Sequence, residues 1–383
     1  MENQPSSDLQ QTIQAMLDEL TESGIEIGLQ AAAYYQGKLI LNAHSGVMDA
    51  LTRKPVESDT LFVSMSSCKG ITATVIHMLT QAGKLGYDDK VADYWPEFAA
   101  NGKADITIRQ VLCHEAGIPQ MPNNVSMDTV LDWGAMVHEI EQLSPVWEPG
   151  TKTGYHGFTF GWILGELAER VDKRKFAQIV QEEICAPLGI SHELYFGVPD
   201  AAESRVAKIS GEELPWIEMP DHLLIKRMLP THLMPITNSA WNESVLHQAV
   251  LPSANACITA NALARMYASL IGDGVDGIRL LNSAQLEQAT LLQTKEPDEV
   301  FMGMVAIPKA LGYWLGNNES ASAMGDRIHT FGHTGMGGMI GFADPKRHFS
   351  FALLKNRFSF NRGDQDTDVL IANKVREWIQ VFN

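Results

Sequence analysis

Ser66 and Lys69 have the residue types and the spacing of a nucleophile and its base. Residues three apart on a helix share one face, so the Lys69 amine can reach the Ser66 hydroxyl. A serine is a poor nucleophile until a neighbour takes its proton, and a partly desolvated lysine can have its pKa lowered toward neutrality. The same spacing also fits a capping serine followed by a solvent-facing lysine. The motif indicates a nucleophile without establishing one.

Tyr155 is the second chemically interesting residue. It lies near the end of the turn-rich stretch 148–157, which leads into the apolar segment 158–165. A phenol beside a lysine cation loses its proton more easily, so Tyr155 is a candidate general base. The alternative is an aromatic half-buried where a loop enters a helix.

A glycine-rich stretch, residues 331–338, forms the third candidate segment. Small residues let a strand backbone approach a substrate closely, and its N–H groups can stabilise an oxyanion. Taken alone, the stretch favours a glycine-rich strand entry or a β-bulge over a catalytic role.

The elements that must position these residues follow from hydrophobic periodicity. Short apolar runs at both ends of the chain predict strands, and the helical period dominates between them. The predicted strands are 27–35, 38–43, 339–342 and 349–354, with turns at 36–37 and 344–347. The predicted helices are 7–20, 71–81, 108–113, 127–142, 160–170, 175–185, 260–271 and 366–381. This order predicts an α/β (α+β) fold: one antiparallel sheet built from both termini and flanked by helices, with a helical region between them.

The composition of the chain argues against several classes of binding partner. The 383 residues carry a formal net charge of −17 and no run of basic residues longer than the three at 173–175, which argues against nucleic acid and anionic membranes. The first residues lack a secretory signal, and no apolar stretch reaches the ~20 residues of a membrane span, so we expect a cytoplasmic protein. Scattered cysteines predict reduced, buried thiols, and His329 and His333 lack further ligands for a metal site. We therefore expect neither cofactor nor metal, and the oligomeric state stays open.

In this order, the three motifs resemble those of class C β-lactamases, penicillin-binding proteins and β-lactamase-like serine esterases. The segments 106–119 and 147–150 resemble the phrases that link these motifs in that family, so the likeness covers nearly the whole chain. It implies a β-lactamase/transpeptidase-like fold in a single catalytic domain over 1–383, with 1–65 and 300–383 as the sheet region and 66–299 mostly helical. It also implies roles for four residues. Ser66 is the nucleophile, Lys69 its first partner and Tyr155 the second base, and the amides of Ser66 and Met336 form the oxyanion hole.

Two departures from the family pattern bear on the substrate. Where the tyrosine motif of lactamases ends in Asn, this chain has Tyr155-His156-Gly157, and His333 replaces the lysine that helps to bind a substrate carboxylate. A largely neutral histidine should weaken recognition of anions. The sequence therefore resembles the esterase branch, like family VIII carboxylesterases, and predicts a small neutral ester as substrate. We expect His333, Gly335, His156 and Trp314 to contact it.

Other functions stay open. A β-lactamase, a D-amino-acid peptidase or an acyltransferase would use the same residues, and a non-catalytic binding protein could keep the fold. Trp314, Tyr313 and Trp162 are candidates for an apolar acyl pocket, although core packing explains each of them as well.

Overall fold

A central six-stranded antiparallel sheet organises the molecule, with strand order β2-β1-β10-β9-β8-β7. The computed structural model describes residues 7–123, 125–211, 219–229, 240–317, 323–359 and 366–381. The strands are β1 Gly28–Tyr35, β2 Lys38–Gly46, β7 Trp314–Leu315, β8 Phe331–Gly335, β9 Met339–Asp344 and β10 Phe349–Lys355. The two predicted pairs of strands, near the start and the end of the chain, are thus confirmed, and β1 joins them by pairing with β10.

The predicted turn between β1 and β2 is confirmed at Gln36 and Gly37. Both residues have positive φ, at 50° and 72°. A two-residue hairpin turn of the kind that matches strand twist requires positive φ at both positions. The tight turn brings Tyr35 opposite Lys38 and so sets the pairing of the two strands.

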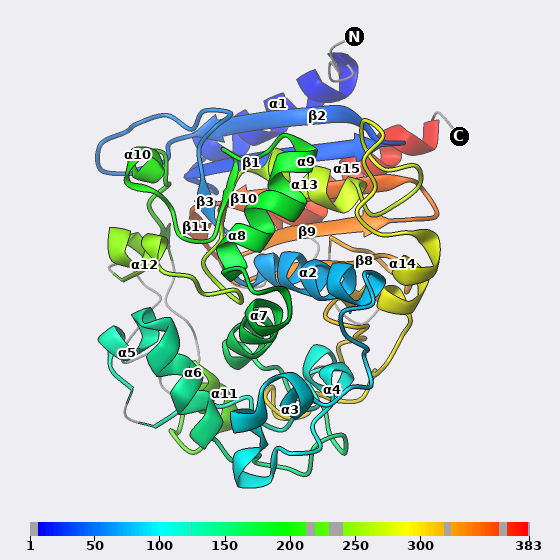
Figure 1. The fold of residues 1–383 in the computed structure, drawn as a ribbon. Helices are drawn as coiled ribbons and strands as arrows, with labels where there is room; N and C mark the ends of the chain where they lie inside the picture. Colours follow the sequence, from blue (N-terminus) through cyan, green and yellow to red (C-terminus); the bar gives the residue numbers. More distant parts are fainter. Residues whose placement is uncertain are drawn as a thin grey trace.

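Helices cover both faces of the sheet (Figure 1). On one face, α1 (Ser7–Glu22) and α15 (Thr367–Val381) pack together and enclose one apolar core with the strands. On the other face, α13 (Ala260–Ala268) lies against β1, β9 and β10, and α2 (Lys69–Gln81) contacts β8. Both faces are therefore buried, which explains why β1, β9 and β10 read as nearly continuous apolar runs rather than alternating ones.

The remaining helices lie mostly on the α2 side of the sheet (Figure 1). They are α3 Val91–Tyr94, α4 Ile108–Leu112, α5 Met127–Leu131, α6 Trp133–Gln142, α7 Thr159–Asp172, α8 Phe176–Val180, α9 Ala186–Leu188, α10 Asp200–Glu203, α11 Leu224–Met228, α12 Ser244–Gln248 and α14 Ser283–Thr290. Short helical turns accompany them: η1 Met65–Cys68, η2 Pro96–Gly102, η3 Gln181–Cys185 and η4 Ala240–Asn242.

Two features of this region differ from the sequence prediction. The single helix predicted over 127–142 is broken at Asp132, whose backbone is extended and whose carboxylate accepts from the Ala135 amide at 2.8 Å, capping α6. The helix predicted over 175–185 changes from α8 to the wider turn η3.

Small strands that the sequence pattern did not indicate also lie outside the central sheet. One small sheet has the order β3-β6-β4, with bounds β3 Phe62–Val63, β4 Leu194–Tyr195 and β6 Cys257–Ile258. A second pairs β5 Ser210–Gly211 with β11 Arg357–Phe358. Strands of two residues are too short to carry a detectable period.

Gly70 allows α2 to pack closely beneath α13, and this predicts an unusual cost for alanine. A Cβ at Gly70 would overlap the Tyr267 hydroxyl. Alanine normally stabilises a helix by about 1 kcal/mol over glycine, but we expect Gly70→Ala to lower the free energy of unfolding by about 1–3 kcal/mol. Gly134→Ala in α6 is the matched control, because its Cβ would meet only the Asp132 carboxylate at 3.5 Å. Urea unfolding of both variants tests this, and a stabilised Gly70→Ala would contradict the close packing.

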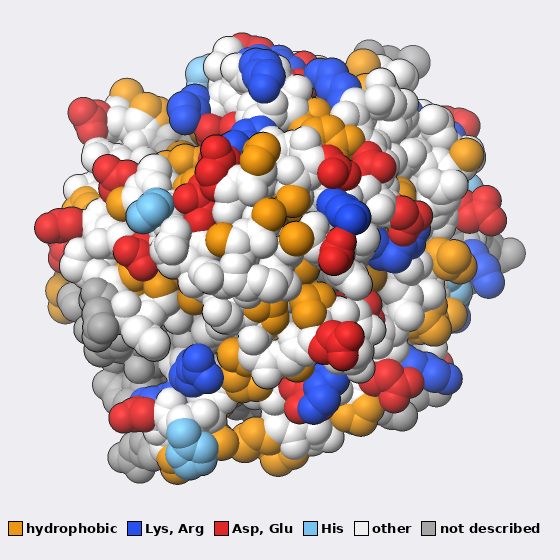
Figure 2. Space-filling model, turned by 60° about the horizontal axis from the view of Figure 1, so that its bottom comes forward, with side chains coloured by type: hydrophobic (Ala, Val, Ile, Leu, Met, Phe, Trp, Pro, Cys, Tyr) orange, Lys and Arg blue, Asp and Glu red, His pale blue; other side chains and the backbone are white. Residues whose placement is uncertain are grey.

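The state of the cysteines and the distribution of surface charge match what the sequence predicts. Cys68, Cys113, Cys185 and Cys257 are buried and carry no disulfide. On the face shown in Figure 2, Lys and Arg side chains are interspersed with acidic ones. Within the described residues, no helix has both the length and the apolar character needed to cross a membrane.

Candidate active site

Ser66 lies in a strained turn between the short strand β3 and helix α2. The preceding residue, Met65, is buried and has φ +46°, a left-handed backbone that side chains disfavour. The end of β8 packs against this turn, where a Cβ on Gly335 would come within 2.6 Å of the Ser64 carbonyl oxygen. The absence of a side chain at Gly335 therefore lets the strand that precedes Met336 approach the Ser66 backbone.

The Lys69 amine is held by three oxygen atoms. Its Nζ lies 3.1 Å from Ser66 Oγ, 2.7 Å from the Gly157 carbonyl and 2.8 Å from the Ser253 carbonyl. A neutral amine has two N–H donors and one lone pair. When the amine is neutral, its two N–H groups can donate to the two carbonyls, which leaves the lone pair for the Ser66 hydroxyl.

Burial also favours the neutral form of this lysine. Lys69 is fully buried, and desolvation lowers its pKa from 10.5 to about 7. At pH 7 and above, a large fraction of the side chain can accept a proton from Ser66. The arrangement is thus that of a nucleophile with an adjacent general base.

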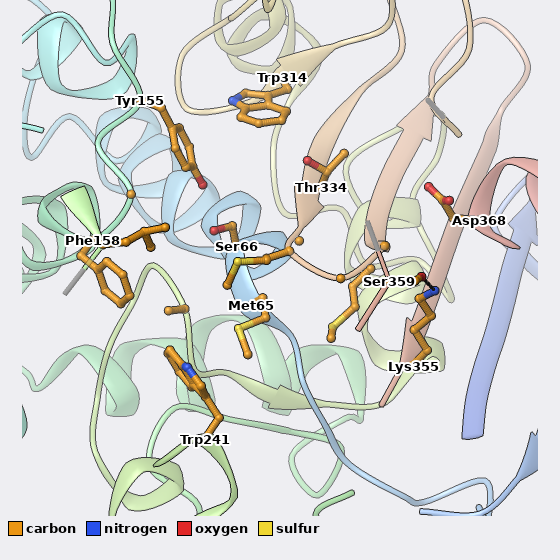
Figure 3. Close-up of a pocket in the computed structure, with 18 of the residues that line it drawn as sticks. Met65, Ser66, Tyr155, Phe158, Trp241, Trp314, Thr334, Lys355, Ser359 and Asp368 are labelled. Atoms are coloured by element: carbon orange, nitrogen blue, oxygen red, sulfur yellow. Dashed lines mark hydrogen bonds between the residues drawn. The ribbon is translucent and has the colours of Figure 1, made fainter. Parts of the chain in front are cut away.

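Tyr155 points its hydroxyl toward Ser66 (Figure 3). The hydroxyl is buried and completes no hydrogen bond with a described residue, and Lys69 Nζ lies 5.0 Å from the ring centroid. Burial raises the pKa of Tyr155, and the Ser66 hydroxyl offsets only part of that rise. The expectation that Lys69 would make this phenol easy to ionise is therefore wrong, because desolvation is the largest influence on its pKa and raises it. Tyr155 is suited to donate or relay a proton as a neutral phenol.

A cavity of about 330 Å³ opens beside these residues, and Ser66 lies between two unlike ends of it (Figure 3). One end is apolar, with Phe158 and Trp241, whereas the other is polar, with Lys355, Ser359 and Asp368. Tyr155 and Trp314 line a third side. Further lining residues are Met65, Gly157, Met228, Leu229, Ala254, Phe301, Thr334, Gly335, Met336, Gly337, Gly338, Met339 and Asp366.

The residues predicted to contact substrate divide into two groups. Gly335 and Trp314 line the cavity with Ser66, Tyr155 and Met336. His156 is buried away from it, and its Nε2 accepts from the Ile118 amide at 3.0 Å while its Nδ1 lies 2.6 Å from the Gly154 carbonyl. The proposed substrate contact of His156 is therefore wrong, because both ring nitrogens are engaged within the protein.

His333 is also absent from the lining and lies behind the aromatic residues of the cavity. Its ring centroid is 4.5 Å from that of Trp314 and 5.9 Å from that of Tyr155, and its Nδ1 lies 2.6 Å from the Thr334 carbonyl. Burial lowers its pKa well below 6.5, so the ring is neutral. Its position favours support of Tyr155 and Trp314 over contact with substrate.

Sequence reasoning missed most of the cavity wall. Phe158, Met228, Leu229, Trp241 and Phe301 come from separate loops and helices whose local patterns indicate only burial. Of the three aromatic residues considered for the pocket, Trp314 lines it, whereas Tyr313 and Trp162 are buried in the core.

Comparison with known proteins places this site in a family. The family model described as Beta-lactamase matches residues 13–376. The chain belongs to the beta-lactamase family. Its sequence is 32% identical over 345 residues to "Esterase/beta-lactamase LipL" of Mycobacterium tuberculosis (strain ATCC 25618 / H37Rv), covering 85% of this chain and 76% of that protein.

Solved structures of beta-lactamase-like proteins share the fold over almost the full length. A family VIII carboxylesterase has a TM-score of 0.88 and 29% identity, covering 99% of this chain and 100% of the other. A penicillin-binding protein homologue from Caulobacter crescentus has a TM-score of 0.83 and 28% identity, covering 98% of each chain. The predicted β-lactamase-like fold is thus confirmed, and the chain is a serine hydrolase of that fold.

Proposed function

We propose that this chain is a carboxylesterase that cleaves neutral esters through an acyl-enzyme on Ser66. The observation that carries the proposal is the fully buried Lys69 amine, 3.1 Å from the Ser66 Oγ atom that lines a largely apolar cavity. The names of the relatives LipL and the family VIII carboxylesterase support ester chemistry.

In the first half of the reaction, Ser66 Oγ attacks the ester carbonyl carbon and Lys69 accepts the hydroxyl proton. The carbonyl oxygen becomes an oxyanion, which the amides of Ser66 and Met336 stabilise, since both residues line the cavity. As the tetrahedral intermediate collapses, the bond to the leaving alkoxide breaks, and Tyr155 delivers a proton to it. Tyr155 regains its proton from the Lys69 ammonium.

In the second half, a water molecule attacks the acyl-enzyme carbonyl and gives its proton to the neutral Lys69 amine. The Ser66–acyl bond then breaks, the proton returns to Ser66 and the carboxylic acid leaves. An alcohol in place of water would give acyl transfer.

The charges around the cavity favour neutral over anionic substrates. Among the described residues of the wall, Lys355 is the one cation, and it is held by Glu26 Oε1 at 2.7 Å and by Ser359 Oγ at 2.8 Å. Asp366 and Asp368 add negative charge at the same end. Among the wall residues that the structure describes, a substrate carboxylate would meet no unpaired cation.

We therefore expect p-nitrophenyl butyrate to be hydrolysed with a kcat/KM about 10–10²-fold above that for nitrocefin, which carries a carboxylate, and also above that for a D-alanyl amide. The factor corresponds to a missing charge-assisted hydrogen bond to the carboxylate, worth about 1.5–3 kcal/mol. Steady-state kinetics on the three substrates with one enzyme preparation measure the ratio. Rapid nitrocefin turnover without ester turnover would replace the proposal with a β-lactamase, and inertness to all three would favour a binding protein.

A further inference from the structure

A buried ion pair lies behind the active site, outside the cavity wall. Lys309 Nζ is 2.8 Å from Asp298 Oδ2, and the two side chains are 1% and 0% exposed. Neither residue lines the cavity, and no step proposed above uses them.

This pair holds the loop that carries Tyr155. The other carboxylate oxygen, Asp298 Oδ1, accepts from the Tyr155 amide at 3.1 Å. Lys309 Nζ also donates to Thr153 Oγ1 at 3.0 Å. The ion pair therefore binds this loop at two points, the Tyr155 amide and the Thr153 side chain.

The same pair holds the rings that pack on Tyr155. Asp298 Oδ1 accepts from the amide of Val300 at 3.0 Å and from that of Phe301 at 3.4 Å. The Phe301 ring stacks on Tyr155 at 5.9 Å between centroids. Lys309 pairs across a tight turn with Trp314, whose ring meets Tyr155 edge-on at 5.4 Å. The Asp298–Lys309 pair thus fixes both the position of the Tyr155 phenol and the shape of the cavity wall beside it.

Stability alone does not explain an ion pair at this place. Removing two charges from water is costly, and an apolar pair of similar volume is often equally stabilising or better. An apolar side chain, however, cannot accept hydrogen bonds from the Tyr155 amide. The effect peculiar to Asp298 is the fixed location of this backbone.

We propose that Asp298, with its charge balanced by Lys309, is a positioning residue that holds the Tyr155 phenol in reach of Ser66. The inference rests on the proposed role of Tyr155 in acylation. A displacement of about 1 Å in a reacting group can cost about 10²-fold in rate. The loss should appear in kcat more than in KM, because neither Asp298 nor Lys309 contacts substrate.

The test compares two double variants that both remove the charges. Asp298→Leu/Lys309→Met is apolar and cannot bind the Tyr155 amide, so we expect kcat to fall about 10²-fold. Asp298→Asn/Lys309→Gln keeps an oxygen at the Oδ1 position, so we expect kcat to stay within about 3-fold of wild type. Should the apolar variant fail to fold, Asp298→Ser/Lys309→Gln replaces it, because serine is too short to reach the amide.

A Tyr155→Phe background separates positioning from general damage to the fold. In that background, Asp298→Leu/Lys309→Met should lower kcat by less than about 3-fold, because the hydroxyl that it displaces is already absent. An equal loss in both backgrounds, or wild-type kcat in the apolar variant, would overturn the inference.

Rates are measured on p-nitrophenyl butyrate and nitrocefin, and by fluorophosphonate labelling of Ser66. If the expected pattern of kcat values is seen with nitrocefin and the ester is not hydrolysed, the positioning role stands and the esterase proposal is rejected. A wild-type chain inert to all three probes would overturn both.

Discussion

Ser66→Ala should lower kcat/KM for p-nitrophenyl butyrate by at least about 10⁴-fold, because no other group can form the acyl-enzyme. The Ser66 Oγ atom is the one that Lys69 Nζ approaches at 3.1 Å, and it lines the cavity. Intact-mass measurement after fluorophosphonate treatment should show one added phosphonyl group on the wild type and none on the variant.

Ser67→Ala is the matched control for this experiment. Ser67 is the next residue in the chain, but its hydroxyl donates to the Ser64 carbonyl at 2.7 Å and is absent from the cavity wall. We expect this variant to retain labelling and most of its activity. Labelling that persists in Ser66→Ala, or that maps to another peptide, would remove Ser66 as the nucleophile.

Lys69→Met should lower kcat/KM for the same ester by about 10²–10⁴-fold, the usual contribution of a general base. For the wild type, kcat/KM should rise with pH through about 7, because the amine accepts a proton only after losing its own and burial lowers its pKa to about 7. The residual activity of Lys69→Met should lack this inflection. A wild-type profile that is flat from pH 6 to 9 would contradict the assignment of Lys69 as base.

The lowered pKa of Lys69 also sets the sign of a stability effect. The unfolded chain keeps the lysine protonated up to its ordinary pKa of 10.5, whereas the folded chain releases the proton near pH 7. Between these values the unfolded state binds more protons, so this group makes the protein more stable as pH rises. We therefore expect the free energy of unfolding of Lys69→Met, relative to that of the wild type, to be higher at pH 6 than at pH 9. Urea unfolding at both pH values measures this difference. An equal difference at the two pH values would show that Lys69 is buried as an ammonium.

The sequence alone determined those features that depend on neighbours along the chain. The i, i+3 spacing brings Ser66 and Lys69 together whatever surrounds them, and positive-φ turn residues place the hairpin at Gln36 and Gly37. The ordered motifs around Ser66, Tyr155 and His333 were specific enough to indicate the family, which the match over residues 13–376 confirms.

Only the tertiary structure decided the burial, the pKa values and the contacts of those residues. Burial lowers the pKa of Lys69, and the groups that bury and hold its amine include the carbonyls of Gly157 and Ser253, which are 88 and 184 positions away in the chain. The ionisation of Tyr155 was misjudged from sequence because desolvation, the largest cause of its raised pKa, depends on every group packed around the ring. His156 and His333 looked exposed to substrate but are covered by residues distant in sequence, and Asp298 had no local signal at all. Spacing is a property of the chain, whereas burial and the electric environment of a charge sum over atoms that only folding brings together.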